Sequence, residues 1–444
     1  MGPSWYWMPD VFERFFSCFG KKVSDYYELK RLDPSYRVYW QGEKHDIPAN
    51  YNELKDLFDK IESGSAEKLD QFLKQAEYKY KVGMKKLVFK PGRSLNEFID
   101  MSVISGVVKL DVFTSMKKHV RKFFKDPRLQ QLIEFPILFL GAQAKDIPAL
   151  YSLMNYADTK LGTWYPIGGM YKIVEGMYSL AKELGAKFYF DHDVVRIECD
   201  KGMAKKVMAK DNGEKIIFDA DVVIGAADYH FIENKLLSEE NRNYDDKYWE
   251  SRVMAPSCLL YYVGLNKKLP QLVHHTLFFD TLFDEHANEI YETKKWPSEP
   301  LFYVCTPSAT DPEVAPAEHE NLFFLIPVAA GLQGDTEELR NRYFEKILSR
   351  FEKKTGASIK DSIIFKQSYS VSDFVYDYNA FKGNAYGLAN TLRQTAILKP
   401  SIRSRKVKNL FFAGQLTVPG PGVPPSLISG EVAAKQVIKY FGKN

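Results

Sequence analysis

Residues 409–437 read NLFFAGQLTVPGPGVPPSLISGEVAAKQV, and this stretch decides how the whole chain is interpreted. It predicts a short buried strand at 409–413, a loop rich in glycine and proline, and a helix from about Pro424 to Phe441. Prolines in a first helical turn leave the amides of the following residues free, and glycines let a ligand approach the backbone. With the positive end of the helix dipole, this order of elements predicts a receptor for an anionic group. The alternative is a structural loop capped by prolines.

A second glycine motif lies near the middle of the chain, where residues 165–186 read YPIGGMYKIVEGMYSLAKELGA. It predicts a Gly-Gly turn followed by a helix from about Tyr171 to Leu184, which Gly185 ends. Short runs of β-branched and aromatic residues predict the next strands, at 187–190, 194–198, 205–209 and 215–218. Asn212-Gly213 is a strong hairpin signal between the last two. The sequence ADVVIGA at 220–226 predicts a further buried strand.

The rest of the chain divides into a helical and a mixed region. Helical patterning dominates up to about Tyr156, with helices expected at 52–61 and 66–80. The mixed region, 229–399, predicts strands and one long helix, at 257–264, 301–306, 322–328 and 336–355. Residues 113–125 combine apolar side chains on one face with five lysines and arginines. That pattern fits a helix lying in a membrane interface and fits a solvated surface helix equally well.

The amino-acid composition excludes several classes of protein. Hydrophobic residues make up 45% and charged residues 27% of 444 residues, which indicates a folded protein of two or more domains. A net charge of +4 is too balanced to suggest nucleic-acid binding. The aromatic content of 14% suits an apolar cavity or an aromatic-rich core. The four cysteines are far apart and form no CxxC pair, so we expect a reducing cytoplasm, and no metal-ligand pattern is discernible. No apolar run has the length of a membrane span.

The motifs together resemble those of the bacterial phytoene desaturase family of carotenoid desaturases. The stretch at 409–437 is similar to the family's C-terminal flavin motif, and YPIGGM at 165–170 to its second flavin-proximal motif. The hairpin unit with Val194 resembles the strand whose valine contacts the adenosine of FAD, and ADVVIGAADYH at 220–230 resembles a strand ending near the flavin. The resemblance covers essentially the whole chain.

The resemblance implies FAD as the cofactor and assigns residues to its site. The implied FAD-binding residues are Gly168, Gly169, Met170, Val194, Gly414, Gln415, Gly422, Val423, Pro424 and Ser426. Gln415 replaces an aspartate that many flavoproteins carry there, which removes one expected hydrogen bond on the ribityl side. Asp126 and Arg128 lie where the family's acidic and basic residues have been considered catalytic, although a surface charge pair explains them as well. His274-His275 is another candidate base, with a pair of satisfied core histidines as the commoner explanation.

The implied fold is α/β, a Rossmann-like FAD domain of the amine-oxidase and phytoene desaturase type with an inserted α+β substrate and membrane domain. We expect the FAD domain at 1–10, 162–229 and 400–444, and the substrate domain at 11–161 and 230–399. A family member should begin with a strand and GxGxxG opening a helix, and this sequence has none. We therefore expect an N-terminally truncated FAD domain, with a complementing upstream polypeptide as one way to complete it.

The implied activity is desaturation of a carotenoid precursor such as phytoene. Hydride would pass to flavin N5 and a proton would then be lost, with quinone or oxygen as the electron acceptor. An apolar substrate requires a long apolar tunnel and contact with a membrane, so we expect peripheral association with the inner face of the cell membrane. Two alternatives remain: a polyene isomerase, ketolase or saturase on the same scaffold, and an inactive fragment that binds an apolar ligand.

Overall fold

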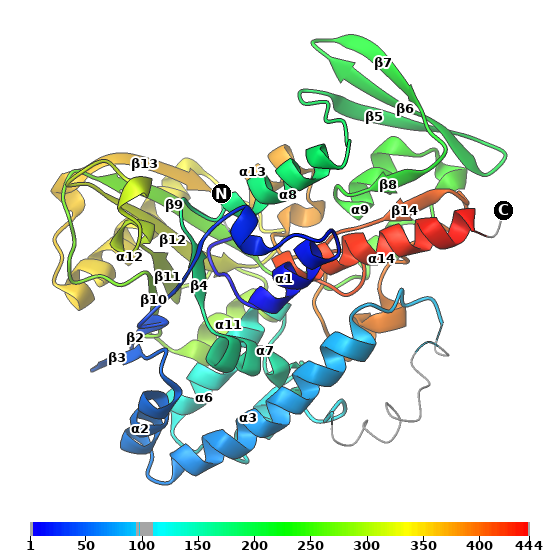
Figure 1. The fold of residues 1–444 in the computed structure, drawn as a ribbon. Helices are drawn as coiled ribbons and strands as arrows, with labels where there is room; N and C mark the ends of the chain where they lie inside the picture. The colour runs from blue at the N-terminus through cyan, green and yellow to red at the C-terminus, as the bar shows by residue number, and fades with distance from the viewer. Residues whose placement is uncertain (1–2, 95–96, 98–109, 443–444) are drawn as a thin grey trace.

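A seven-stranded mixed sheet forms the larger half of the molecule (Figure 1). The computed structural model describes residues 3–94, 97 and 110–442. The strand order is β13-β9-β12-β11-β10-β2-β3, in which only β10 and β2 run parallel. The strands are β2 (Tyr36–Tyr39), β3 (Lys44–Ile47), β9 (Ser257–Leu265), β10 (His275–Phe278), β11 (Phe302–Cys305), β12 (Glu320–Val328) and β13 (Ile363–Tyr369).

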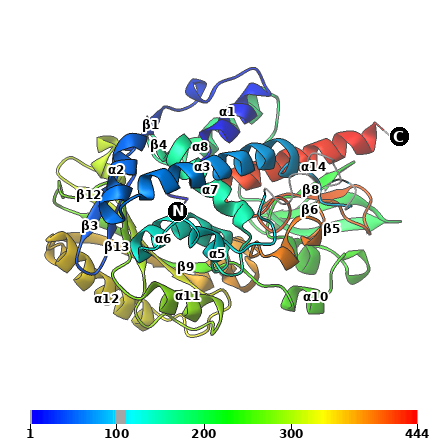
Figure 2. The same cartoon turned by 90° about the horizontal axis from the view of Figure 1, so that it is seen from below.

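Both faces of this sheet are covered. Along β12 every second residue is fully buried, as the alternation of side chains in a strand requires. One face packs against α12 (Glu337–Thr355), where Phe344 and Phe351 meet Phe324. The other face contributes to a core shared with α2 (Tyr51–Ile61), α3 (Ser65–Val82) and α6 (Pro127–Glu134). Seen from below, α3 crosses much of the molecule (Figure 2).

The smaller half contains the C-terminal strand and helix. β14 (Leu410–Phe412) pairs in parallel with β8 (Val223–Gly225), and α14 (Val423–Phe441) follows β14. Beside them lies an antiparallel sheet of β5 (Asp193–Asp200), β6 (Met203–Asp211) and β7 (Glu214–Asp219). Asn212 and Gly213 both have positive φ, 47° and 88°, so the predicted hairpin is confirmed.

The N-terminal segment packs into the smaller half. α1 (Pro9–Ser17) contacts α14, and Phe12, Phe16 and Tyr27 share a cluster with α8 (Lys172–Glu183). Residues 11–28, which the sequence places with the substrate domain, thus pack against α8. β1 (Leu29–Arg31) then pairs with β4 (Trp164–Pro166), the strand that leads into the Gly-Gly turn. The remaining helices are α5 (Met116–Val120), α7 (Leu153–Tyr156), α9 (Tyr229–Phe231), α10 (Asp246–Glu250), α11 (Phe283–Tyr291) and α13 (Val371–Tyr378).

Several expected elements differ in the structure. Residues 29–47 contain β1, β2 and β3 although helical patterning was expected there, because their edges pair with β4 and β10. Residues 187–190 form no strand, and Phe190 is 66% exposed. β8 is a strand, but Ile224 is 45% exposed, because β8 has a strand neighbour on one side only among the described residues.

The basic segment 113–125 contains only the five-residue helix α5. Ser115 caps it, and the amides of Met116 and Lys117 donate to the carbonyls of Ile147 and Ala144, which ties the segment to a non-helical neighbour. Phe113, expected on an amphipathic face, is 84% exposed outside the helix. A single long amphipathic helix is therefore wrong for this segment.

Candidate functional site

The loop between β14 and α14 is held open by its glycines. Gly414 has a φ of +116°, and its amide donates to Ser429 Oγ of α14 at 3.0 Å. A Cβ built on Gly414 would have no heavy atom within 4 Å, so the backbone is accessible to a ligand there. Gly422, with a φ of +108°, is the residue that precedes the first turn of α14.

The start of α14 offers fewer free amides than the sequence suggests. Pro424 and Pro425 have no N–H, and the amide of Ser426 donates to Gly422 O at 2.9 Å within the first turn. The Ser426 amide is therefore not free for a ligand, and the implied role of Ser426 in FAD binding stays a prediction. Val423 supplies the amide that remains for an anion at the positive end of the helix.

The Gly168–Gly169 turn is anchored by a residue that sequence reasoning missed. Asp311 Oδ2 accepts a hydrogen bond from the Gly168 amide at 2.7 Å and from Tyr165 Oη at 3.4 Å. A Cβ built on Gly169, whose φ is +99°, would meet only Tyr165 Oη at 3.9 Å, so this turn also exposes its backbone. Because Asp311 lies 143 residues from Gly168, no local sequence signal could have identified it.

The two glycine loops, predicted separately, come together in one region. Met170 from the first and Val423 from the second pack against the same buried cluster around Phe16 and Ile173. Side chains of both loops therefore share one cluster, and the cofactor site that the sequence predicts there stays a prediction.

Gln415 and Val194 are also placed by the structure. Gln415 Nε2 donates to Asn384 Oδ1 at 3.2 Å, so its side chain is held by the loop that contains Gly387. Val194 lies in β5 opposite Ala209 and packs against the cluster that contains Leu410 and Phe412 of β14. Its implied contact with the adenosine of FAD remains a prediction.

An aromatic and histidine cluster adjoins the Gly168 turn. The rings of Tyr165 and His274 are 4.5 Å apart, and Trp5 stacks on His275 at 4.0 Å. Burial lowers the pKa of His274 to about 3 and that of His275 well below its usual range, so both are neutral at pH 7. Their Nε2 atoms are buried and have no hydrogen-bond partner among the described residues, while their Nδ1 atoms meet Thr310 and Tyr303 hydroxyls at 2.8 and 2.7 Å.

The same cluster contains three side chains of the types that bind metal ions. Their spacing in the sequence does not indicate a metal site. One ligand atom each from His274, His275 and Cys305 lie within 4.8 Å of one another, and all three residues are buried. Burial raises the pKa of the Cys305 thiol to about 12, so a metal would have to displace its proton. The sequence predicts no metal site. Whether these three residues bind a metal ion stays an open question for experiment.

Asp126 and Arg128 form a helix cap and ion pair. Asp126 caps α6 by accepting from the Arg128 amide at 2.8 Å, and its carboxylate binds the Arg128 guanidinium at 2.9 and 2.6 Å. This pairing lowers the pKa of Asp126. Arg128 also contacts Glu43, and Glu62 accepts from the Asp126 amide at 2.8 Å. These contacts explain both side chains structurally, and their catalytic role stays a prediction.

The whole fold is shared with known oxidoreductases. An oxidoreductase from Methanosarcina mazei superimposes with a TM-score of 0.58 at 14% identity, covering 98% of this chain and 86% of that one. Cyclohexylamine oxidase from Brevibacterium oxydans superimposes with a TM-score of 0.53 at 12% identity, covering 98% and 86%. These likenesses show that the chain has the fold of these two proteins.

Sequence relatives define the group within that class. Carotenoid 3,4-desaturase from Haloarcula japonica is 41% identical over 442 residues, which cover 99% of this chain and 88% of the relative. The ζ-carotene-forming phytoene desaturase of Myxococcus xanthus is 29% identical, covering 99% and 84%. The chain belongs to the carotenoid desaturase family, whose members are oxidoreductases that act on CH–CH bonds. No family model matches the sequence. In the described residues no helix combines the length and apolarity needed to cross a membrane.

Proposed function

We propose that this protein is an FAD-dependent carotenoid desaturase. The observation that carries the proposal is the convergence of the Gly168–Met170 turn and the start of α14 on one buried cluster. FAD, when bound, supplies the acceptor for the hydride that desaturation removes from carbon. Gly169 and Gly414 fit such a group because their backbones are open to approach, and Val423 with the α14 dipole fits its negative edge.

The side chains around these loops position the site and keep it dry. Asp311 fixes the Gly168 turn through a 2.7 Å hydrogen bond, and Ser429 fixes Gly414 through a 3.0 Å bond. Trp5, Tyr165 and Tyr303 surround the two neutral histidines with apolar ring surface. An apolar wall is what a polyene without polar groups requires, because it can be recognised only by shape and burial.

The substrate is a carotenoid, and the relatives suggest which bond is attacked. The 41% identity to a carotenoid 3,4-desaturase exceeds the 29% identity to a phytoene desaturase. We therefore favour desaturation at the C3–C4 bond over the phytoene desaturation expected from motifs alone. A 4,4'-diapolycopene oxygenase from Methylomonas, 28% identical over 99% of this chain, keeps oxidation of a carotenoid end as the second candidate.

A direct assay separates these activities. The purified chain, incubated with FAD, a quinone and either phytoene or lycopene in lipid vesicles, should convert a carotenoid to a product lacking two hydrogens with a red-shifted spectrum. Conversion of lycopene but not phytoene supports the C3–C4 assignment. A product that has gained oxygen identifies the second candidate, and no flavin-dependent product with either carotenoid contradicts the proposal.

We also propose that the protein contacts the inner face of the cell membrane through the segment 113–125. Phe113 is 84% exposed, and Lys118, Lys122 and Lys125 are exposed beside it. An exposed aromatic ring with neighbouring cations suits an anionic lipid surface. Replacing the three lysines with glutamate should release the protein from anionic vesicles, and unchanged binding would argue against this surface.

A further inference from the structure

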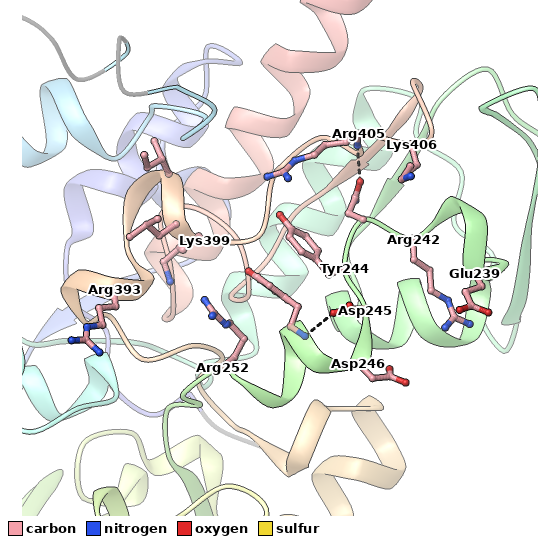
Figure 3. A pocket seen from close by; sticks show the side chains of 14 residues that line it. Glu239, Arg242, Tyr244, Asp245, Asp246, Arg252, Arg393, Lys399, Arg405 and Lys406 are labelled. Carbon is pink, nitrogen blue, oxygen red and sulfur yellow. Dashed lines mark hydrogen bonds between the residues drawn. The ribbon is translucent and has the colours of Figure 1, made fainter.

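A large polar cavity lies beside the loop between β14 and α14, because its lining residue Lys399 packs against Gly420 of that loop. It has a volume of about 840 Å³ and lies between the segment that leads into and through α10 and the segment 393–406 (Figure 3). Six cations line it against three carboxylates. The cations are Arg242, Arg252, Arg393, Lys399, Arg405 and Lys406, and the carboxylates are Glu239, Asp245 and Asp246. The cavity therefore has an excess of positive charge at neutral pH.

The cations in this cavity lack acidic partners. Some partly buried arginines elsewhere are paired, as in Arg340 with Asp335 at 2.7 Å and Arg14 with Glu431 at 2.5 Å. Within the described part of the chain, none of the six cavity cations forms an ion pair. Asp245 is used as a helix cap, accepting from the Tyr248 amide at 2.7 Å. The positive charge of the cavity is thus available to a ligand.

Lys399 is the unusual member of the group. It is 3% exposed, and its Nζ atom is buried without a hydrogen-bond partner in the described structure. Burial lowers its pKa to about 7. An ammonium group buried without a partner is destabilising unless an anion satisfies it. In Figure 3 the nitrogen-bearing ends of Lys399 and Arg252 point toward the same part of the cavity.

Three exposed aliphatic side chains lie next to cavity residues in the sequence, and one of them, Leu398, lines the cavity. Val253, Leu392 and Leu398 are 44%, 43% and 49% exposed, and each lies next to a cavity cation in sequence. Gln394 joins the two segments, because it accepts from the Val253 amide and donates to the Val253 carbonyl, both at 2.8 Å. Exposed aliphatic side chains around a cationic pocket suit a headgroup whose acyl chains remain in a lipid layer.

We propose that this cavity binds a phosphate group, held by Lys399, Arg252 and Arg393. The exposed aliphatic side chains of Val253, Leu392 and Leu398 favour a membrane phospholipid as the carrier of the phosphate. A soluble phosphate compound is the other source of the same chemistry. The site adjoins the loop between β14 and α14, because Cε of Lys399 lies 3.4 Å from a Cβ built on Gly420. Its test does not depend on desaturase activity.

The first measurement is the rise in melting temperature that sn-glycerol 3-phosphate causes in the full chain. The double variant Arg393→Glu with Arg405→Glu should raise the apparent Kd at least tenfold, because two exposed cations become repulsive. The matched control is Lys210→Glu with Lys215→Glu, an exposed cross-strand pair on β6 and β7 with the same change in charge. The control should leave the Kd unchanged.

Lys399→Met tests the buried cation itself. The variant should melt at a higher temperature than the wild type without phosphate, because an unpaired buried ammonium has been removed, and should lose most of the phosphate-induced rise. Sedimentation with phosphatidylglycerol vesicles then distinguishes the sources. A tenfold loss of vesicle binding in the Arg393/Arg405 variant identifies a lipid headgroup, whereas cavity-dependent binding of glycerol phosphate alone identifies a soluble ligand. The proposal is overturned if neither binding responds to the cavity variants.

Discussion

Lys399 should make the stability of this protein depend on pH above neutrality. Its folded pKa of about 7 lies below the value of about 10.4 expected in the unfolded chain. Between these values the unfolded chain binds more protons, so this group makes the free energy of unfolding rise with pH from about 7 to about 10. Below pH 7 the lysine is charged in both states and the cost of burying it is fully present.

The measurement is urea unfolding of the wild type and of Lys399→Met from pH 6.5 to 9.5. Buried thiols such as Cys305, whose pKa is raised to about 12, act in the opposite direction in part of this range. The difference between wild type and variant isolates the lysine, and the wild type should gain a few kcal/mol relative to the variant as the pH rises. Parallel curves would show that Lys399 is charged and stabilised in the folded protein.

Gly387 should be less replaceable than another glycine of similar backbone angle. Its φ is +81°, and a Cβ there would lie 2.8 Å from Gln415 O, the residue after Gly414. Gly213, with φ +88°, has nothing within 4 Å. Gly213→Ala should cost about 1 kcal/mol from strain, whereas Gly387→Ala should cost about 3 kcal/mol and weaken FAD retention. If chemical denaturation shows that both variants lose the same free energy of unfolding, the loop at Gln415 moves freely to accommodate the added Cβ.

For single residues, the sequence predicts the required backbone angles better than it predicts which distant residues come into contact. The pair Asn212-Gly213 indicates its own turn because the φ preferences of the two residues suffice. Asp311, by contrast, anchors Gly168 across 143 residues, and Lys399 is unusual only because nothing pairs with it. Such roles are set by tertiary packing and leave no local pattern.

Removing one backbone amide from the first turn of α14 tests whether the start of this helix binds the negative edge of FAD. Val423→Pro removes the amide that remains free while keeping the helix start, because proline is favoured in the first turn and Gly422 already has an extended ψ of 160°. Loss of a hydrogen bond to a charged group should weaken FAD binding about tenfold or more. Val423→Ala keeps the N–H and should bind FAD as the wild type does. Fluorescence titration checks this, and equal weakening in both variants would assign the effect to the side chain.

Long periodic elements were predictable and short edge strands were not. α2, α3, α12 and α14 match the expected helices within about two residues, because each repeats a buried stripe over several turns. β3 reads KHDI and β13 has an almost wholly exposed middle, so neither shows the alternation that identifies a half-buried strand. Their strand conformation comes from pairing with β2 and β9. Residues 187–190 have the aromatic composition typical of a strand, but they form no strand and pair with no neighbour in the described structure.

The whole molecule contains a parallel pair of strands with an open edge. Within the described residues β8 pairs only with β14, and Ile224 is 45% exposed although Phe411 and Phe412 of β14 are fully buried. Parallel sheets are normally covered on both faces and contain more than two strands. The free edge of β8 is therefore open to pairing with a further parallel strand. The complementing polypeptide expected from the sequence, a GxGxxG-bearing βαβ unit, would supply it.

Complementation tests this expectation. Co-expression with a GxGxxG-bearing βαβ segment should raise the amount of FAD that copurifies with the chain, since that unit provides a phosphate-binding helix start. Ile224→Lys should reduce this gain several-fold without unfolding the chain, because the side chain is already partly exposed. Ile217→Lys on β7, at a side chain that is 48% exposed, is the matched control and should leave the gain intact. If the chain alone retains one FAD per molecule and Ile224→Lys changes nothing, the edge of β8 needs no partner and the glycine loops suffice for the cofactor.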